Sequence, residues 1–82
     1  MNIIYVDDEA AAVEKFEYII HTLESVTTLN TFTEAAPAQE YAEQHTIDIA
    51  FLDIEMPGMR GLELAKILRK INSNTKIVFL TA

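Results

Sequence analysis

Three mostly apolar runs, separated by stretches with helical periodicity, constrain the fold of this chain more than any other feature. The runs are short and rich in β-branched and aromatic residues, which indicates strands buried on both faces; they cover residues 3–6, 47–52 and 76–80. Residues 26–32 alternate less cleanly and predict a more exposed strand. Strands and helices therefore alternate along the chain, which predicts parallel βαβ units with right-handed crossovers and an α/β fold.

The helical spacing of apolar residues predicts three helices between these strands. The first begins at Ala10 and continues for about four turns. The second covers residues 34–45, with Thr33 as a candidate N-cap and Pro37 in or before the first turn, where proline is tolerated. The third follows a loop that contains both glycines, and it ends at residues 72–74. The residues of the first helix that we expect in the core are Phe16, Ile19, Ile20 and Leu23.

The composition excludes several classes of protein. The 82 residues contain no cysteine, which excludes disulfides and cysteine-based zinc sites. The apolar runs are too short to span a membrane and the first of them does not resemble a signal peptide, so we expect a cytoplasmic protein without a membrane partner. A net charge of -7 argues against direct binding of nucleic acid by this chain.

Polar side chains follow the predicted strands at their carboxyl ends. Asp7 and Asp8 follow the first strand, Asp53 follows the run 47–52, and Thr81 follows the last strand. In an open parallel sheet, ligands bind outside the carboxyl ends of the strands, at the point where the strand order reverses. Three carboxylates gathered there would repel one another and raise their pKa values unless a cation were present. We therefore expect a hard divalent ion, most simply Mg²⁺.

Three blocks of the sequence resemble the signature blocks of the response-regulator receiver domain of two-component signalling. They are Ile-Tyr-Val-Asp-Asp-Glu at 4–9, Phe-Leu-Asp-Ile-Glu-Met-Pro-Gly-Met-Arg-Gly at 51–61, and Val-Phe-Leu-Thr-Ala at 78–82. The resemblance covers the whole chain in order. It implies a flavodoxin-like parallel sheet with strand order 2-1-3-4, in which the strands ending on Asp7 and Asp53 are neighbours.

The resemblance also implies a role for each acid. Asp53 would be the phosphoacceptor that forms an aspartyl-phosphate. Asp8 and Asp53 would hold Mg²⁺ through their side chains, the main-chain carbonyl of Glu55 would be the third protein ligand, and Asp7 would act through water. A carboxylate is a competent nucleophile toward phosphorus, and a bound metal neutralises charge on the transferred group.

Two further positions and the partners follow from the same resemblance. Thr81 would be the switch hydroxyl that turns toward a phosphoryl oxygen, and the main-chain N–H of Ala82 would be a further donor. A histidine kinase would supply the phosphoryl group, and an effector domain would respond to it. The run from Leu52 to Leu64 is most similar to receivers attached to LytTR-type DNA-binding domains, so we expect a signalling domain that regulates transcription and not an enzyme.

The chain departs from the family pattern after its fourth strand. Residues 1–82 correspond to a partial receiver domain that lacks the fourth helix, the fifth strand with its lysine, and the fifth helix. Residues 77–80 are apolar at consecutive positions, yet no later strand is present to pair with their outer edge. Because such an edge is a template for pairing, we expect self-association through this strand or through swapped elements.

Two alternatives to a functional receiver stay open on the sequence alone. Haloacid-dehalogenase-like phosphatases also place a nucleophilic Asp after an apolar strand, but their motif requires Asp-x-Asp where this chain has Asp53-Ile54-Glu55. The other alternative is a structural fragment that folds and assembles without accepting phosphate.

Overall fold

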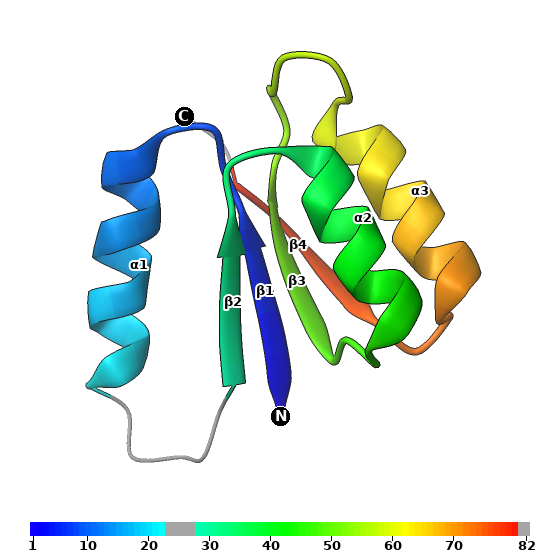
Figure 1. Cartoon of the computed structure of the whole chain (residues 1–82), viewed down its shortest axis with the longest axis horizontal. Helices are drawn as coiled ribbons and strands as arrows, with labels where there is room; N and C mark the ends of the chain where they lie inside the picture. Colours follow the sequence, from blue (N-terminus) through cyan, green and yellow to red (C-terminus); the bar gives the residue numbers. More distant parts are fainter. Residues whose placement is uncertain (23–27, 81–82) are drawn as a thin grey trace.

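Four parallel strands form a single sheet in the computed structural model, which describes residues 1–22 and 28–80. The strand order is β2-β1-β3-β4, so the predicted α/β class and the order 2-1-3-4 are confirmed. Figure 1 shows α1 on one side of the sheet and α2 and α3 side by side on the other. The elements are β1 (Asn2–Val6), α1 (Ala10–His21), β2 (Thr28–Phe32), α2 (Ala35–Gln44), β3 (Ile49–Asp53), α3 (Gly61–Ile71) and β4 (Lys76–Leu80).

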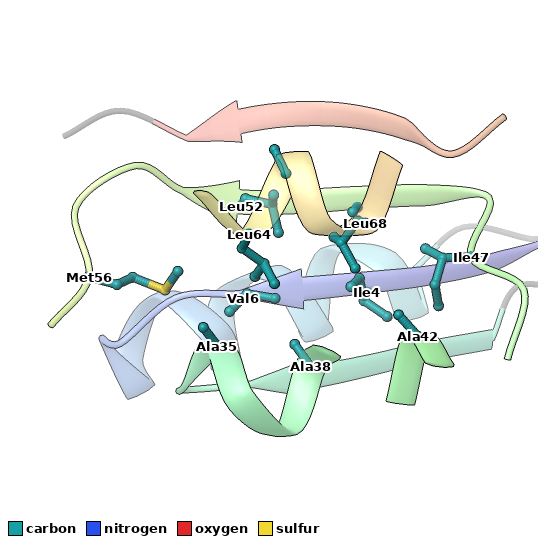
Figure 2. Close-up of a cluster of buried hydrophobic side chains, with 12 residues drawn as sticks. Ile4, Val6, Ala35, Ala38, Ala42, Ile47, Leu52, Met56, Leu64 and Leu68 are labelled. Carbon is teal, nitrogen blue, oxygen red and sulfur yellow. The ribbon is translucent and has the colours of Figure 1, made fainter. Parts of the chain in front are cut away.

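Alternation along β1 supplies side chains to both faces of the sheet. Ile4 and Val6 are fully buried against α2 and α3, where Figure 2 shows them in the main hydrophobic cluster. Tyr5 lies on the opposite face and stacks on Phe16 of α1, with ring centroids 4.3 Å apart. A strand covered on both faces must be apolar at consecutive positions, which explains the run at residues 3–6.

Small and branched side chains fill the layer between the sheet and the two neighbouring helices (Figure 2). α2 contributes alanines, which allow its backbone to approach the sheet and α3 closely, while α3 contributes leucines that occupy the remaining volume. No helix within the described ranges is long and apolar enough to cross a membrane. The helix residues of this cluster are Ala35, Ala38, Ala42, Leu64, Ala65 and Leu68.

The third strand begins two residues later than its apolar run predicts. Ile47 is buried in the core, but it precedes the strand, and its carbonyl accepts a hydrogen bond of 2.7 Å from the Thr75 hydroxyl. Asp48 caps the start of the neighbouring strand, because its carboxylate accepts the N–H of Asn2 at 2.6 Å. The apolar run at residues 47–52 therefore includes Ile47, a core residue of the preceding loop, in addition to the strand itself.

The ends of α2 also differ from the prediction. Thr33 is not the N-cap; Glu34 occupies that position with extended backbone, and no side chain caps the helix. The prediction of Thr33 relied on residue preference alone, and the chain turns into the helix one residue later. Pro37 does lie in the first turn, as expected, where its missing N–H has no intrahelical acceptor to lose.

The predicted core of α1 is only partly correct. Phe16 and Ile20 are half-buried, whereas Ile19 is 51% exposed. Ile19 lies about 100° around the helix from Ile20, toward the side of α1 that faces away from the sheet. Leu23 and Val26, which the sequence assigned to the helix and to the next strand, lie outside the described residues.

Candidate functional site

The carboxyl ends of β1 and β3 bring three acids together, as the sequence predicted. The two strands are parallel neighbours, with Val6 opposite Leu52. Asp7 and Asp8 leave β1 directly after this pair, and Asp53 is the last residue of β3. One carboxylate oxygen from each acid lies within 4.8 Å of the others. The site is therefore made by strand pairing between segments that are far apart in the sequence.

Asp7 is the buried member of the cluster, with 8% of its surface exposed. Its carboxylate accepts a hydrogen bond of 3.0 Å from the N–H of Glu9 and one of 3.4 Å from the Tyr5 hydroxyl. Its own N–H donates to the carbonyl of Phe32 at 3.0 Å. These contacts compensate the burial of a carboxylate, whereas the neighbouring Asp8 is exposed.

Asp53 is half-buried at the centre of the site. The N–H of Glu55 donates to its Oδ1 at 3.3 Å and orients the carboxylate. Burial is the main cause that raises the pKa of Asp53 above its ordinary value, and the charges of Asp7 and Asp8 raise that pKa further, against the opposing effect of the Glu55 N–H. The site thus favours a proton or a cation at Asp53.

A depression in the surface lies over the three acids. Its described lining contains five carboxylates and a tyrosine, and none of these lining residues is cationic. Oxygen donors without a paired cation are the donor set that Mg²⁺ binds, so the residues present fit such an ion. The lining residues are Tyr5, Asp7, Asp8, Glu9, Ala12, Asp53, Ile54, Glu55 and Leu80.

The loop after Asp53 returns to the site through Gly61. The N–H of Gly61 donates to the carbonyl of Ile54 at 3.1 Å. A Cβ at Gly61 would overlap the carbonyl oxygen of Asp53 and come within 2.9 Å of its carbon, so only glycine fits. This close approach attaches the start of α3 to the residue that carries the central carboxylate.

The other predicted site residues have different outcomes. Glu55 is exposed and lines the depression, but its side chain is not a member of the three-carboxylate cluster. Thr81 and Ala82 lie outside the described residues. Leu80, the last described residue, lies opposite Asp53 in register, so β4 does lead toward the site.

Tyr5 is a site residue that the sequence reading assigned only to a strand. Its hydroxyl donates to Asp7, and burial is the first cause that raises the pKa of Tyr5, followed by the negative charge of Asp7. The signal that could have found it is the spacing of two residues, because positions i and i+2 of a strand share a face. The phenol holds the buried acid in place.

The raised pKa of Asp53 predicts a pH-dependent gain of stability for Asp53→Asn. Deprotonation of Asp53 is less favourable in the folded than in the unfolded protein, so the free energy of unfolding falls as pH rises from the unfolded pKa of 3.8 through the folded value. In chelator at neutral pH, Asp53→Asn should raise the melting temperature by a few degrees. The difference should shrink as the pH is lowered toward about 4, measured by circular dichroism.

Glu43→Gln is the matched control for this experiment. Glu43 is exposed on α2 and does not line the depression. Its replacement should leave the pH dependence of the melting temperature close to that of the parent chain. A lower melting temperature for Asp53→Asn at neutral pH would contradict the inference that the charged form of Asp53 destabilises the folded chain.

Comparison with known proteins agrees with this site. The family described as response regulator receiver domain matches residues 3–82. The sensory transduction protein LytT of Bacillus cereus is 33% identical over 82 residues, which is 100% of this chain and 33% of LytT. The cyclic di-GMP phosphodiesterase response regulator RpfG of Xanthomonas campestris is 32% identical over 77 residues, which is 94% of this chain and 20% of RpfG.

A solved structure shares both the fold and the sequence pattern. The response regulator protein TrrA of Thermotoga maritima, in complex with Mg²⁺ and beryllofluoride, superposes with a TM-score of 0.88 at 33% identity. The alignment covers 99% of this chain and 69% of TrrA. This chain spans a third or less of the lengths of LytT and RpfG. The family match over residues 3–82, together with the acidic site at the carboxyl ends of β1 and β3, shows that the chain belongs to the response regulator receiver domain family.

Proposed function

We propose that Asp53 accepts a phosphoryl group from a histidine kinase and that the resulting aspartyl-phosphate switches a downstream output. The observation that carries this proposal is the position of Asp53: it is half-buried, oriented by the N–H of Glu55, and close to Asp7 and Asp8. The similarity to TrrA, whose structure is a complex with Mg²⁺ and beryllofluoride, supports this proposal.

The proposed transfer is a single displacement at phosphorus. A carboxylate oxygen of Asp53 attacks the phosphorus of a phosphohistidine, the new O–P bond forms, and the P–N bond breaks. The electron pair of that bond leaves with the imidazole nitrogen. The Glu55 N–H positions Oδ1 of Asp53 during the transfer. Asp53 must be deprotonated to attack, and burial together with the charges of Asp7 and Asp8 opposes this deprotonation by raising its pKa.

Mg²⁺ is the proposed cofactor. Asp8 and Asp53 would bind it through their carboxylates and Glu55 through its main-chain carbonyl, while Asp7, already held by Tyr5 and Glu9, would act through water. When bound, the ion neutralises negative charge on the transferred group. Asp8 is suited to direct ligation because its side chain is exposed beside Asp53.

The response to phosphorylation is proposed to involve the end of β4. Thr81 would donate its hydroxyl to a phosphoryl oxygen, and the N–H of Ala82 would be a second donor. The pairing of Leu80 with Asp53 supports this, because it leads the chain toward the acceptor. We propose a DNA-binding effector domain as the output; LytT, a sensory transduction protein, is similar to this chain over one third of its own length.

The wider context of the chain is also proposed. Residues 1–82 would form the first part of a receiver, without the fourth helix, fifth strand and fifth helix; the match to 69% of the TrrA chain supports this. The proposed location is the cytoplasm. Self-association through β4 or through swapped elements stays a prediction.

The receiver family signals through a modified side chain, and the proposed chemistry of this chain is stoichiometric self-phosphorylation and dephosphorylation. The phosphatase alternative loses its support, because the receiver family matches residues 3–82 and the second acid of the Asp-x-Asp motif is here Glu55, outside the carboxylate cluster. A structural fragment that cannot be phosphorylated is the remaining alternative. Unlike a functional receiver, it should not incorporate a phosphoryl group from a phosphate donor.

Incubation with phosphoramidate and Mg²⁺ tests the proposal. We expect the intact mass to increase by one phosphoryl group per chain, and chelation of Mg²⁺ should prevent the change. Mg²⁺ should also alter the tyrosine fluorescence, because the Tyr5 hydroxyl contacts Asp7. An unchanged mass at saturating Mg²⁺, in a chain that is folded by circular dichroism, would identify the incompetent fragment instead.

Tyr5→Phe is the control for the fluorescence measurement. This variant keeps the ring that stacks on Phe16 and removes the hydroxyl that contacts Asp7. The fluorescence of the remaining tyrosines should respond little to Mg²⁺, since Tyr41 bonds to Asn2 and Asn30 away from the acids. An equal response in both chains would show that the signal does not report the site.

A further inference from the structure

Both carboxylate oxygens of Asp7 accept hydrogen bonds from the chain itself. Oδ1 accepts the N–H of Glu9 at 3.0 Å, and Oδ2 accepts the hydroxyl of Tyr5 at 3.4 Å. Within the described residues, the carboxylate of Asp53 accepts one hydrogen bond, from the N–H of Glu55. The chain therefore fixes the orientation of Asp7 more completely than that of Asp53.

Distance does not separate Asp7 from the other acids of the site. One oxygen of Asp7 lies within 4.8 Å of an oxygen of Asp8 and of an oxygen of Asp53. Proximity alone would therefore allow Asp7 to bind the same ion as these two acids. The property that distinguishes Asp7 is the pair of hydrogen bonds that its oxygens already accept.

The fold holds the Tyr5 hydroxyl in place. The side chain is 6% exposed, and its ring stacks on Phe16 with an interplanar angle of 18°. The ring of Phe51 lies 6.4 Å from that of Tyr5 and 4.8 Å from that of Phe16. Because β1, α1 and β3 each contribute one ring to this cluster, packing keeps the phenol beside Asp7 without the help of an ion.

A phenol is a suitable donor for a carboxylate that belongs to a cation site. Its neutral hydroxyl occupies a lone pair of Asp7 and adds no positive charge to the cluster. A lysine or arginine in the same place would neutralise the acid and weaken the attraction of the site for a divalent ion. The Tyr5 hydroxyl therefore restricts the position of Asp7 while the cluster keeps its negative charge.

Mg²⁺ and Ca²⁺ place different demands on such a restricted acid. Mg²⁺ prefers octahedral geometry, keeps several waters and uses about one or two carboxylates, whereas Ca²⁺ takes about six to eight oxygen ligands in a flexible arrangement. A carboxylate with both oxygens engaged can accept a hydrogen bond from a metal-bound water through its remaining lone pairs. It is poorly suited to become an additional direct ligand of Ca²⁺.

We propose that Tyr5 is a positioning residue that holds Asp7 away from direct ligation and thereby makes the site prefer Mg²⁺ to Ca²⁺. The inference rests on the proposed Mg²⁺ site and adds the residue that determines which ion the site accepts. It concerns the binding of the ion alone and does not require phosphoryl transfer. Removal of the hydroxyl would free Oδ2 of Asp7, which gives Ca²⁺ a further ligand and gives Mg²⁺ little.

Isothermal titration calorimetry with Mg²⁺ alone and with Ca²⁺ alone tests this preference. Tyr5→Phe keeps the ring that stacks on Phe16 and removes the hydroxyl that contacts Asp7. We expect the ratio of Mg²⁺ affinity to Ca²⁺ affinity to fall about three- to ten-fold, mainly through tighter binding of Ca²⁺. An unchanged ratio, or an equal loss of affinity for both ions, would overturn the role of Tyr5 and leave the proposed Mg²⁺ site intact. A parent chain that does not bind Mg²⁺ would overturn both.

Tyr41→Phe is the matched control, because it removes the same group from another part of the fold. The Tyr41 hydroxyl donates to Asn2 at 3.2 Å and accepts from Asn30 at 2.9 Å, and Tyr41 does not line the acidic depression. This variant should leave the ratio of the two affinities unchanged, even where it lowers the melting temperature. A similar fall of the ratio in both variants would contradict a specific role of Tyr5.

The effect of Tyr5 should depend on the carboxylate of Asp7. In Asp7→Asn chains, Tyr5→Phe should change the ratio less than about two-fold, because the group through which the hydroxyl acts is absent. Circular dichroism of each variant verifies its fold. An equal change of the ratio in both backgrounds would show that Tyr5 acts independently of Asp7 and would overturn the inference.

Carbon-13 NMR of the Asp7 carboxyl carbon gives a second readout. The chain has four aspartates, so protein labelled at aspartate gives a simple carboxyl spectrum. Saturating Ca²⁺ should shift the Asp7 resonance more in Tyr5→Phe than in the parent chain, where the hydroxyl still occupies Oδ2. Asp48, whose carboxylate accepts the N–H of Asn2, is the internal control and should not respond. Equal shifts of the Asp7 resonance in the two chains would overturn the proposed positioning role.

Discussion

Asp53→Asn is expected to abolish the incorporation of a phosphoryl group from phosphoramidate, even at saturating Mg²⁺. An amide is not a nucleophile toward phosphorus under these conditions, and the replacement keeps the size of the side chain and its contact with the Glu55 N–H. Intact-mass spectrometry measures the result. The variant should remain folded, since removing the charge relieves the repulsion from Asp7 and Asp8.

Variants of the acids around Asp53 distinguish the binding of Mg²⁺ from the acceptance of the phosphoryl group. Asp8→Asn should keep the acceptor but raise the Mg²⁺ concentration needed for labelling, by about 10- to 100-fold. Asp48→Asn is a control at the opposite end of β3, where the carboxylate bonds to the N–H of Asn2 instead of lining the depression. Full labelling of the Asp53→Asn variant would show that another residue is the phosphoacceptor.

Gly61→Ala is expected to reduce the free energy of unfolding by about 3 kcal/mol, because its Cβ would overlap the backbone of Asp53. This is a large share of the roughly 4–12 kcal/mol expected for a domain of this length. The atoms that collide are backbone atoms, so neither a rotamer change nor a flexible side chain relieves the overlap. The backbone must shift at Asp53, and labelling should also decline.

Gly58→Ala is the matched control for that change. Gly58 has a positive φ of 84°, which alanine adopts at a cost of about 1–2 kcal/mol, but no atom lies within 4 Å of the position of its Cβ. Urea unfolding should therefore rank Gly61→Ala as the more destabilised chain. Equal losses of unfolding free energy in the two variants would show that the effect at Gly61 comes from local backbone preference, and not from contact with Asp53 at the end of β3.

Local patterns were sufficient for most of the fold. Consecutive apolar residues identified the strands, and β1 is buried as that pattern predicts, because a strand covered on both faces has no position for a polar side chain. The same pattern was wrong about the burial of β4, where Val78 and Phe79 are exposed. Element ends were less well predicted: Ile47 is a core residue that precedes β3, and Thr33 does not cap α2. Both errors arise because a side chain can be buried, or favour a cap, without the backbone hydrogen bonds that define the element.

The acids of the site could be predicted, but the groups that support them could not. Asp7, Asp8 and Asp53 were recognisable because each follows an apolar strand in the order that the receiver family shows. The hydrogen bond from the Tyr5 hydroxyl and the steric need for glycine at position 61 depend on distances between backbones. No local pattern contains those distances.

The sequence by itself determined the alternation of strands and helices and the acids that end the strands, since both depend on periodicity and on residue type along a short segment. Only the tertiary structure decided that Asp53 is oriented by the Glu55 N–H, that Ile19 faces solvent, and that Leu80 at the end of β4 lies opposite Asp53. The physical reason is that these properties arise from hydrogen bonds and packing between distant segments, which exist only once the sheet has formed.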